Sequence, residues 1–185
     1  ARLADQAAAG EPSAVLQARI TALRRMLARE LHPDAAASGA DRAVRVYDPG
    51  TGKLEATLRG ARSPVTSLAF FPDSNRLAAA GGDMAVVVWD VTKQKAVKEL
   101  AGHESAVLSV AVADDGKLVV SGGALGDRTV RGFDPDAGKQ VWKWTARSAV
   151  CAVAVRKGNT HVAVGLADGT LVVLDASGGT PKEVF

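Results

Sequence analysis

Three histidines and one cysteine are the side chains of this chain best suited to acid–base, nucleophilic or metal chemistry: His32, His103, His161 and Cys151. A hydrolase needs a nucleophile, a base and an orienting carboxylate in a supporting motif, and no Ser/His/Asp or Cys/His motif of that kind surrounds these residues. A lone cysteine can form neither an internal disulfide nor a cysteine-rich zinc site. We therefore expect no catalytic residue and no metal site.

Glycine pairs at 81–82, 122–123 and 178–179 are the remaining candidates for ligand chemistry. A phosphate-binding loop requires a lysine and a helix directly after the glycines, and none of these pairs has them. The pairs are better interpreted as turn glycines with positive φ. No cofactor is expected.

Composition limits the possible classes of protein. The chain has 185 residues, of which 47% are hydrophobic and 23% charged, enough for a folded core. Its net charge of +3 comes from 23 basic and 20 acidic residues, and no part is strongly basic, which argues against nucleic-acid binding. No apolar run reaches the length of a membrane-spanning helix. Nothing indicates a small-molecule substrate.

Residues 1–40 differ from the rest and are predicted to form a helical segment and linker. An apolar stripe predicts an amphipathic helix between Ser13, a plausible N-cap, and Leu31, with Pro33 preventing its continuation. A targeting or membrane-surface helix has a similar pattern, but such helices are poor in acidic residues, and this segment contains Asp5, Glu11 and Glu30. The chain starts at Ala1 without a methionine, which suggests processing or trimming.

The run LRRMLARELHPD, from Leu23 to Asp34, resembles the second helix and the following His-Pro-Asp loop of a J-domain. The resemblance implies that His32, Pro33 and Asp34 would engage a heat-shock chaperone, and it gives the alternative function of a co-chaperone adaptor. A J-domain also needs a third helix, whereas this chain continues through AAASGAD into a strand-like segment. Proline and aspartate can equally stop a helix.

From residue 41 onward the chain is a repeat array. Four segments align, DRAVRVYD, DMAVVVWD, DRTVRGFD and DGTLVVLD, and their starts are 42, 44 and 41 residues apart. Between them lie apolar strand-like segments, including 65–70, 107–112 and 150–155, each followed by a turn and a further strand. Four short strands per period are typical of a β-propeller blade.

The array resembles the WD-repeat family, because it contains both of the family's dipeptides, Trp89-Asp90 and Gly102-His103. The resemblance implies an all-β fold over 41–185, a partial β-propeller of antiparallel four-stranded blades. The strands number 13 or 14, about three and a half blades, with two (43–48 and 54–59) in the first blade. Because propellers close with four or more blades, we expect another polypeptide, another copy or missing sequence to complete the ring.

In this family a His, a Ser or Thr, an Asp and the Trp form a hydrogen-bonded tetrad in each blade. The tetrad is incomplete here, since Ala80 takes the serine place in the blade of Trp89, and Phe133 takes the tryptophan place beside His103 and Ser121. Structural roles are implied for Asp41, Asp83, Trp89, Asp90, His103, Ser121, Asp127, Asp134, Asp168 and Asp175.

The resemblance implies a non-catalytic scaffold that binds other proteins as a subunit of a larger complex. Arg62, Glu104 and Arg147 recur at like positions in three loops and are our candidates for partner contacts. We expect the protein to work inside the cell, in the cytoplasm.

Overall fold

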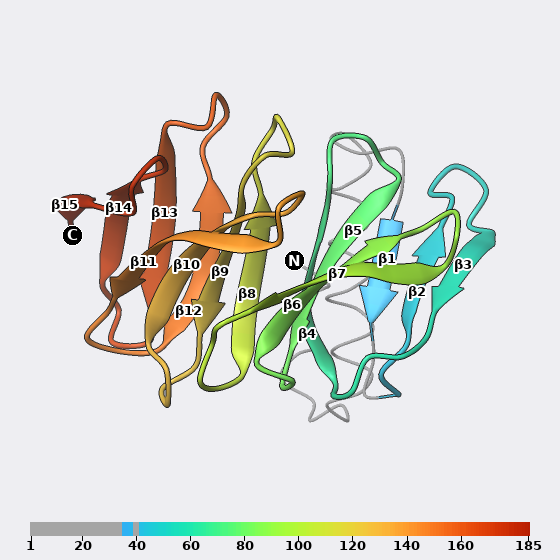
Figure 1. Cartoon of the computed structure of the whole chain (residues 1–185), viewed down its shortest axis with the longest axis horizontal. Helices are drawn as coiled ribbons and strands as arrows, with labels where there is room; N and C mark the ends of the chain where they lie inside the picture. The colour runs from blue at the N-terminus through green and yellow to red at the C-terminus, as the bar shows by residue number, and fades with distance from the viewer. Residues whose placement is uncertain (1–34, 39–40) are drawn as a thin grey trace, which may run out of the picture.

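The computed structural model describes residues 35–38 and 41–185, and every regular element in them is a β-strand (Figure 1). The strands are β1 (Ala35–Ser38), β2 (Val44–Tyr47), β3 (Leu54–Leu58), β4 (Val65–Phe70), β5 (Arg76–Gly81), β6 (Ala85–Asp90), β7 (Lys95–Ala101), β8 (Val107–Val112), β9 (Val119–Gly123), β10 (Thr129–Asp134), β11 (Lys139–Thr145), β12 (Val150–Val155), β13 (His161–Leu166), β14 (Leu171–Asp175) and β15 (Pro181–Val184). The predicted helix at 13–31 and the His32-Pro33-Asp34 tripeptide lie outside the described residues.

The strands form four antiparallel sheets that follow the chain order. We call them sheet A (β1–β3), sheet B (β4–β7), sheet C (β8–β11) and sheet D (β12–β15). The inner strands β4, β8 and β12 lie next to one another, and the sheets stand in a row with sheets A and D at its ends (Figure 1). This is the arrangement of blades in part of a WD propeller.

The first sheet is larger than the repeat pattern predicts. The expected 13 or 14 strands are in fact 15 among the described residues, because β1 adds a third strand to sheet A through its pairing with β2. The run Ala35–Ser38 consists of alanine and serine, whose low strand propensity hides it from a sequence pattern. It also places a strand where a J-domain would begin its third helix. The division at residue 40 stays a prediction.

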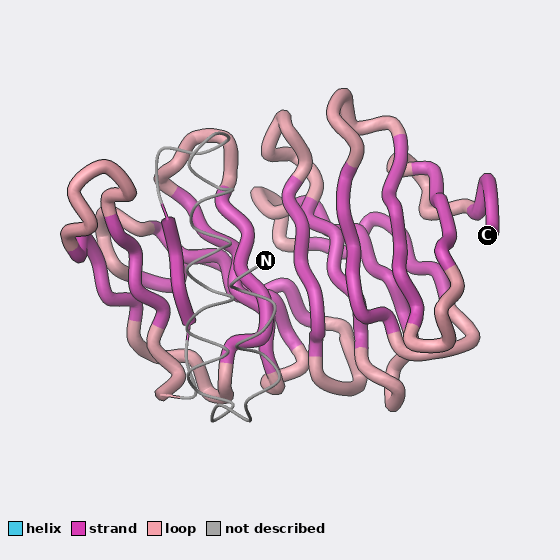
Figure 2. The backbone as a smooth tube through the Cα atoms, turned by 180° about the vertical axis from the view of Figure 1, so that it is seen from behind, coloured by secondary structure: helices cyan, strands magenta, loops and turns pink. Residues whose placement is uncertain are grey.

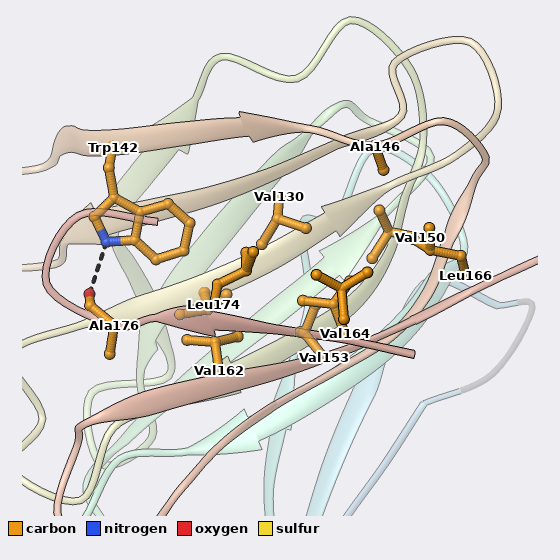
Figure 3. Close-up of a cluster of buried hydrophobic side chains, with 12 residues drawn as sticks. Val130, Trp142, Ala146, Val150, Val153, Val162, Val164, Leu166, Leu174 and Ala176 are labelled. Carbon is orange, nitrogen blue, oxygen red and sulfur yellow. Dashed lines mark hydrogen bonds between the residues drawn. The ribbon is translucent and has the colours of Figure 1, made fainter. Parts of the chain in front are cut away.

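Three apolar cores lie between neighbouring sheets, because the two faces of each strand point to different neighbours. Val86 and Val88 of sheet B pack with Val110 and Phe133 of sheet C. Between sheets C and D, the indole of Trp142 crosses the gap and donates its Nε1–H to the carbonyl oxygen of Ala176, at 2.9 Å (Figure 3).

Inner strands are also joined by hydroxyl groups. Ser67 accepts a hydrogen bond from the amide of Val110, and Ser109 accepts one from the amide of Val153, both at 3.1 Å. These two serines hold the same position in successive blades, so each inner strand is tied to the next in the same way.

The positive φ predicted for the glycine pairs is found at one of their positions. Of the six glycines, only Gly179 has a positive φ, of 64°. Gly122 instead provides room, since a Cβ there would lie 2.4 Å from Cγ1 of Val150 on the next sheet. A pair of glycines gives the same sequence signal for a turn and for a close approach of two sheets.

The aspartates that end the third strands cap the hairpins that follow. Oδ1 of Asp48 accepts from the amide of Gly50 at 2.7 Å, and Oδ1 of Asp90 accepts from the amide of Lys93 at 2.8 Å. Asp134 and Asp175 do the same in sheets C and D. These hydrogen bonds hold the pKa of Asp90 below its ordinary value, because they favour the charged carboxylate.

Candidate functional site

Sheet C contains the three polar side chains that the resemblance to the WD-repeat family implies to lie together. Nε2 of His103 is 2.7 Å from Oγ of Ser121, and Nδ1 of His103 is hydrogen-bonded to Oδ2 of Asp127. All three residues are buried. His103 precedes β8, Ser121 is in β9 and Asp127 precedes β10, so the network joins three parts of one blade.

Two further residues extend the network beyond the predicted tetrad. Thr129 donates to Asp127 at 2.6 Å, and Arg131 places its Nη2 3.2 Å from the other carboxylate oxygen of Asp127. Arg131 also donates to Gln140 at 2.7 Å on the outermost strand. The side chains of Arg131 and Asp127 are only 6% and 1% exposed, so this is a buried ion pair whose hydrogen-bonding groups have partners.

Burial, and to a smaller extent the charge of Arg131, favours the neutral form of His103. Burial lowers the pKa of His103 below its ordinary value, although the hydrogen bond that His103 donates to Asp127 acts in the opposite direction. Burial alone would raise the pKa of Asp127, but hydrogen bonds from Thr129 and His103 lower it overall. Neutral His103 therefore donates from Nδ1 to the carboxylate and accepts at Nε2 from the hydroxyl of Ser121.

Sheet B contains the tryptophan at the family's position, Trp89. Nε1 of Trp89 is buried without a hydrogen-bond partner in the part of the chain that the structure describes. Asp83 is half-buried at its expected place in the turn before β6. The serine place is taken by Ala79 and not by the predicted Ala80. Ala79 pairs with Val87 as Ser121 pairs with Arg131, whereas Ala80 lies in the core on the opposite face.

The other two blades hold their aspartates with arginine. In sheet A, Arg45 donates to Asp41 at 2.6 Å, with both side chains partly exposed. In sheet D, Arg147 donates from Nε to Asp168 at 2.7 Å and also contacts Thr170. Hydrogen bonds from Thr170 and then from Arg147 lower the pKa of Asp168. Arg45 holds the position that Arg131 has in sheet C, and Arg147 holds the position of Glu104, so the two arginines reach their aspartates from different places in the blade.

The predicted partner-contacting residues lie in the loops that lead into the inner strands. These loops lie at the same end of the sheets as the turns that join the second strand of each sheet to the third. We call this end of the sheets the loop rim. Arg62 is 3.5 Å from Glu99 and its side chain is 75% exposed, and Glu104 is exposed. Arg147 is 68% exposed despite its contact with Asp168. All three occupy equivalent positions, three residues before the first valine of the inner strand.

Two exposed apolar side chains on the loop rim were not predicted. Met84 follows Asp83 in the turn of sheet B, and Leu125 lies in the corresponding turn of sheet C, where it is 69% exposed. The repeat spacing contained a signal for Leu125. Three residues separate Gly123 from Asp127, whereas one separates the equivalent glycine and aspartate in sheet B, and this lengthens the spacing to 44 residues.

The chemistry open to these residues is limited by burial. Ser121, His103 and Asp127 are hydrogen-bonded in the order of a hydrolase triad, but the whole network is enclosed under the loop rim and a substrate could not reach Ser121. Over residues 35–38 and 41–185 there is no group of three His, Cys, Asp or Glu side chains able to hold a metal ion. In the same part of the chain, no helix is long and apolar enough to cross a membrane.

Comparison with protein families finds two matches to the model described as "WD domain, G-beta repeat", at residues 52–90 and 94–134. Each match spans the last strand of one sheet and the first three strands of the next sheet. The first match covers β3–β6 and the second covers β7–β10. The sequence repeat is therefore offset by one strand from the structural blade. A search of curated protein sequences gave no match.

Proposed function

From a chain that carries WD repeats and folds them into four-stranded blades, we propose a non-catalytic scaffold that binds other proteins through its loop rim, as a subunit of a larger cytoplasmic complex. WD repeats indicate a protein-interaction domain, and proteins built from them are generally non-catalytic scaffolds. Loops held on a rigid frame suit this role, because they can vary without loss of the fold.

The exposed apolar residues of the loop rim are the observation that carries the proposal. Leu125 and Met84 project from neighbouring blades, and charged Arg62, Glu104 and Arg147 lie in the adjoining loops. Exposed apolar side chains beside exposed charged ones are typical of a protein-binding surface. The buried network of sheet C fixes the turn that presents Leu125, since Asp127 anchors its end.

The row of sheets supports membership of a complex. Blades of a propeller form a ring in which each sheet has two neighbours, whereas the described part of sheet D has one, sheet C. We propose that other polypeptide chains complete the ring.

The test is affinity capture with the whole chain as bait, comparing the wild type with Leu125→Ser. The matched control is Val141→Ser, which removes an exposed apolar side chain (56% exposed) from outer strand β11. We expect the wild type and Val141→Ser to retain the same partner proteins and Leu125→Ser to retain fewer. Equal retention by all three would exclude the loop rim as the binding surface, and no retained partner would exclude the scaffold function.

A further inference from the structure

The loop rim differs from the opposite end of the sheets in the kind of cation it presents. Loops and turns gather at these two ends, with the strands between them (Figure 2). Among the described residues, the loop-rim connections between strands contain five arginines and no lysine: Arg42, Arg59, Arg62, Arg128 and Arg147. The connections at the opposite end contain four lysines and one arginine: Lys53, Lys93, Lys117, Lys157 and Arg156. Because a guanidinium binds an oxyanion through two parallel hydrogen bonds, whereas an ammonium acts as a point charge, the loop rim is suited to oxyanion recognition.

Three of the five loop-rim arginines are exposed and form no ion pair with any described residue: Arg42, Arg59 and Arg128. The other two contact carboxylates of the chain itself. Arg42 and Arg59 lie at the same end of β2 and β3, since Val44 pairs with Leu58. Arg128 lies in the turn before β10 of sheet C. Sheets A and C thus each present unpaired guanidinium groups to solvent.

Three large side chains of the loop rim occupy a backbone conformation that glycine adopts more readily. Arg42, Met84 and Arg128 each follow the aspartate of the turn before a third strand, and their φ angles are 59°, 61° and 53°. The corresponding residue of sheet D is Gly169, with a φ of 88°. Bulky residues in this region cost conformational free energy, and they cluster at functional sites. All three side chains are exposed, so packing does not explain their presence.

The charge of the loop rim changes sign between sheets A and C, where the unpaired arginines lie. Asp83, in the turn of sheet B, and Glu104, in the loop from sheet B to sheet C, form no ion pair with any described residue. The exposed side chain of Met84 lies in the same turn as Asp83, and exposed Leu125 lies in the turn of sheet C. A ligand that fits this order is anionic at its ends and apolar between them.

The spacing of the sheets sets the length of such a ligand. Sheets packed face to face are about 10 Å apart, so the unpaired arginines of sheets A and C are separated by about 20 Å. An extended chain rises about 3.3 Å per residue and covers this distance with about six residues. Given the proposed function, on which this inference rests, we propose that the loop rim binds an extended segment of a partner protein that carries aspartate or glutamate at both ends of an apolar stretch of about six residues.

Carboxylates fit the unpaired arginines better than phosphates do. Arginines near this end of the sheets already bind carboxylates within the fold, in the pairs Arg45–Asp41, Arg131–Asp127 and Arg147–Asp168. A phosphate ester carries nearly two negative charges and is recognised by converging arginines. The unpaired arginines lie instead on separate sheets, and Asp83 and Glu104 between them would repel a continuous row of phosphates.

The first experiment measures how much of a fluorescent peptide pool the immobilised whole chain retains. In each pool a central stretch of about six residues is random among leucine, valine, isoleucine and methionine, and both flanks consist of glutamate, glutamine or lysine. We expect the glutamate pool to be retained about tenfold more strongly than the glutamine pool, and the lysine pool least. Equal retention of the glutamate and glutamine pools would overturn the proposal.

The positive φ angles allow a variant that removes the guanidinium groups without disturbing the turns. Arg42→Gly combined with Arg128→Gly should reduce retention of the glutamate pool about tenfold, while the urea midpoint stays the same or rises. The matched control is Gln94→Gly, which makes the same kind of change at a φ of 53° in the hairpin between β6 and β7, at the opposite end of the sheets. It should leave retention unchanged. A lower urea midpoint in the double variant would show that the two side chains hold their turns and would overturn their assignment to binding.

The second experiment uses the native partners in the affinity capture. The double variant should retain fewer of them than Gln94→Gly does, and the partner segment cross-linked to the loop rim should be acidic at both ends. Partners lost with Leu125→Ser but kept by the double variant would overturn this inference and leave the loop-rim function standing. Absence of any partner would exclude the scaffold function, while the peptide pools would still decide the chemistry of the loop rim. Loss of capture after phosphatase or nuclease treatment of the extract would mean that phosphate groups occupy the loop rim and would overturn the choice of carboxylates.

Discussion

The guanidinium of Arg131 lies 3.2 Å from the carboxylate of Asp127 in an ion pair that is almost completely buried. Arg45 and Asp41 form a pair with the same four-residue spacing in sheet A, but their side chains are 33% and 50% exposed. One sequence pattern, Asp-Arg-x-Val-Arg, thus produces two ion pairs in different surroundings. The difference arises because sheet C has a neighbour on each side.

Replacing Arg131 by alanine should destabilise the fold strongly, because Asp127 would be left as an uncompensated buried charge. The expected loss in the free energy of unfolding is about 3–5 kcal/mol, measured by urea denaturation. Arg45→Ala is the matched control and should have a much smaller effect, since water solvates Asp41. Similar losses in the two variants would show that burial does not determine the contribution of this pair.

Stability should fall as the pH falls below about 6.5, because burial lowers the pKa of His103 in the folded chain. Between the folded-state pKa and 6.5, the unfolded chain binds a proton that the folded chain does not, so acid favours unfolding. Above 6.5 this contribution is fully present. Urea midpoints at about pH 8 and about pH 5.5 measure the change.

His103→Gln should remove part of this pH dependence and lower the stability at about pH 8, because the bonds to Ser121 and Asp127 are lost. His161→Gln removes a histidine outside the network and should leave the dependence in place. If the wild type and His103→Gln lost the same stability between the two pH values, His103 would not be the source of the pH dependence.

Ala79→Ser should stabilise the chain by about 0.5–1.5 kcal/mol, because a hydroxyl on the face of Trp89 can accept from its Nε1–H, which has no partner among the described residues. Ala80→Ser is the control, since it puts the same hydroxyl on the opposite face, in the core against sheet C. It should destabilise by about 1–3 kcal/mol. If urea denaturation showed Ala80→Ser to be the more stable variant, residue 80 and not residue 79 would hold the position of the family's serine.

Ala79 and Ala80 show that the repeat pattern predicts the strands but not their register. Matching the glycine pair 81–82 to 122–123 aligns Ala80 with Ser121, but the turn of sheet C is two residues longer than that of sheet B, and the register shifts by one. A shift of one residue moves a side chain to the other face of a strand. The repeat period was sufficient to predict the blades, whereas the register depends on pairing with neighbouring strands.

The candidate site was predictable in part for a related reason. His103, Ser121 and Asp127 belong to the repeat, and the structure brings them together as expected. Arg131 looks in sequence like any charged strand residue, and only the neighbouring sheets bury it. The strand β1 was missed because backbone pairing with β2, and not apolar side chains, holds Ala35–Ser38 in the sheet.

Gly122→Ala and Gly165→Ala should change the free energy of unfolding by different amounts, although the two glycines hold the same position in sheets C and D. An alanine Cβ at position 122 would lie 2.4 Å from Cγ1 and 2.9 Å from Cβ of Val150, so sheets C and D would have to separate, at a cost of about 1–3 kcal/mol. At position 165 the nearest atom is Cβ of Ala152, at 3.6 Å, so the isolated chain should change by less than about 0.5 kcal/mol. Urea denaturation of both variants measures the difference. A large loss from Gly165→Ala would mean that the face of sheet D that points away from sheet C is already covered. A tolerated Gly122→Ala would mean that the junction between sheets C and D is looser than the packing of Val150 implies.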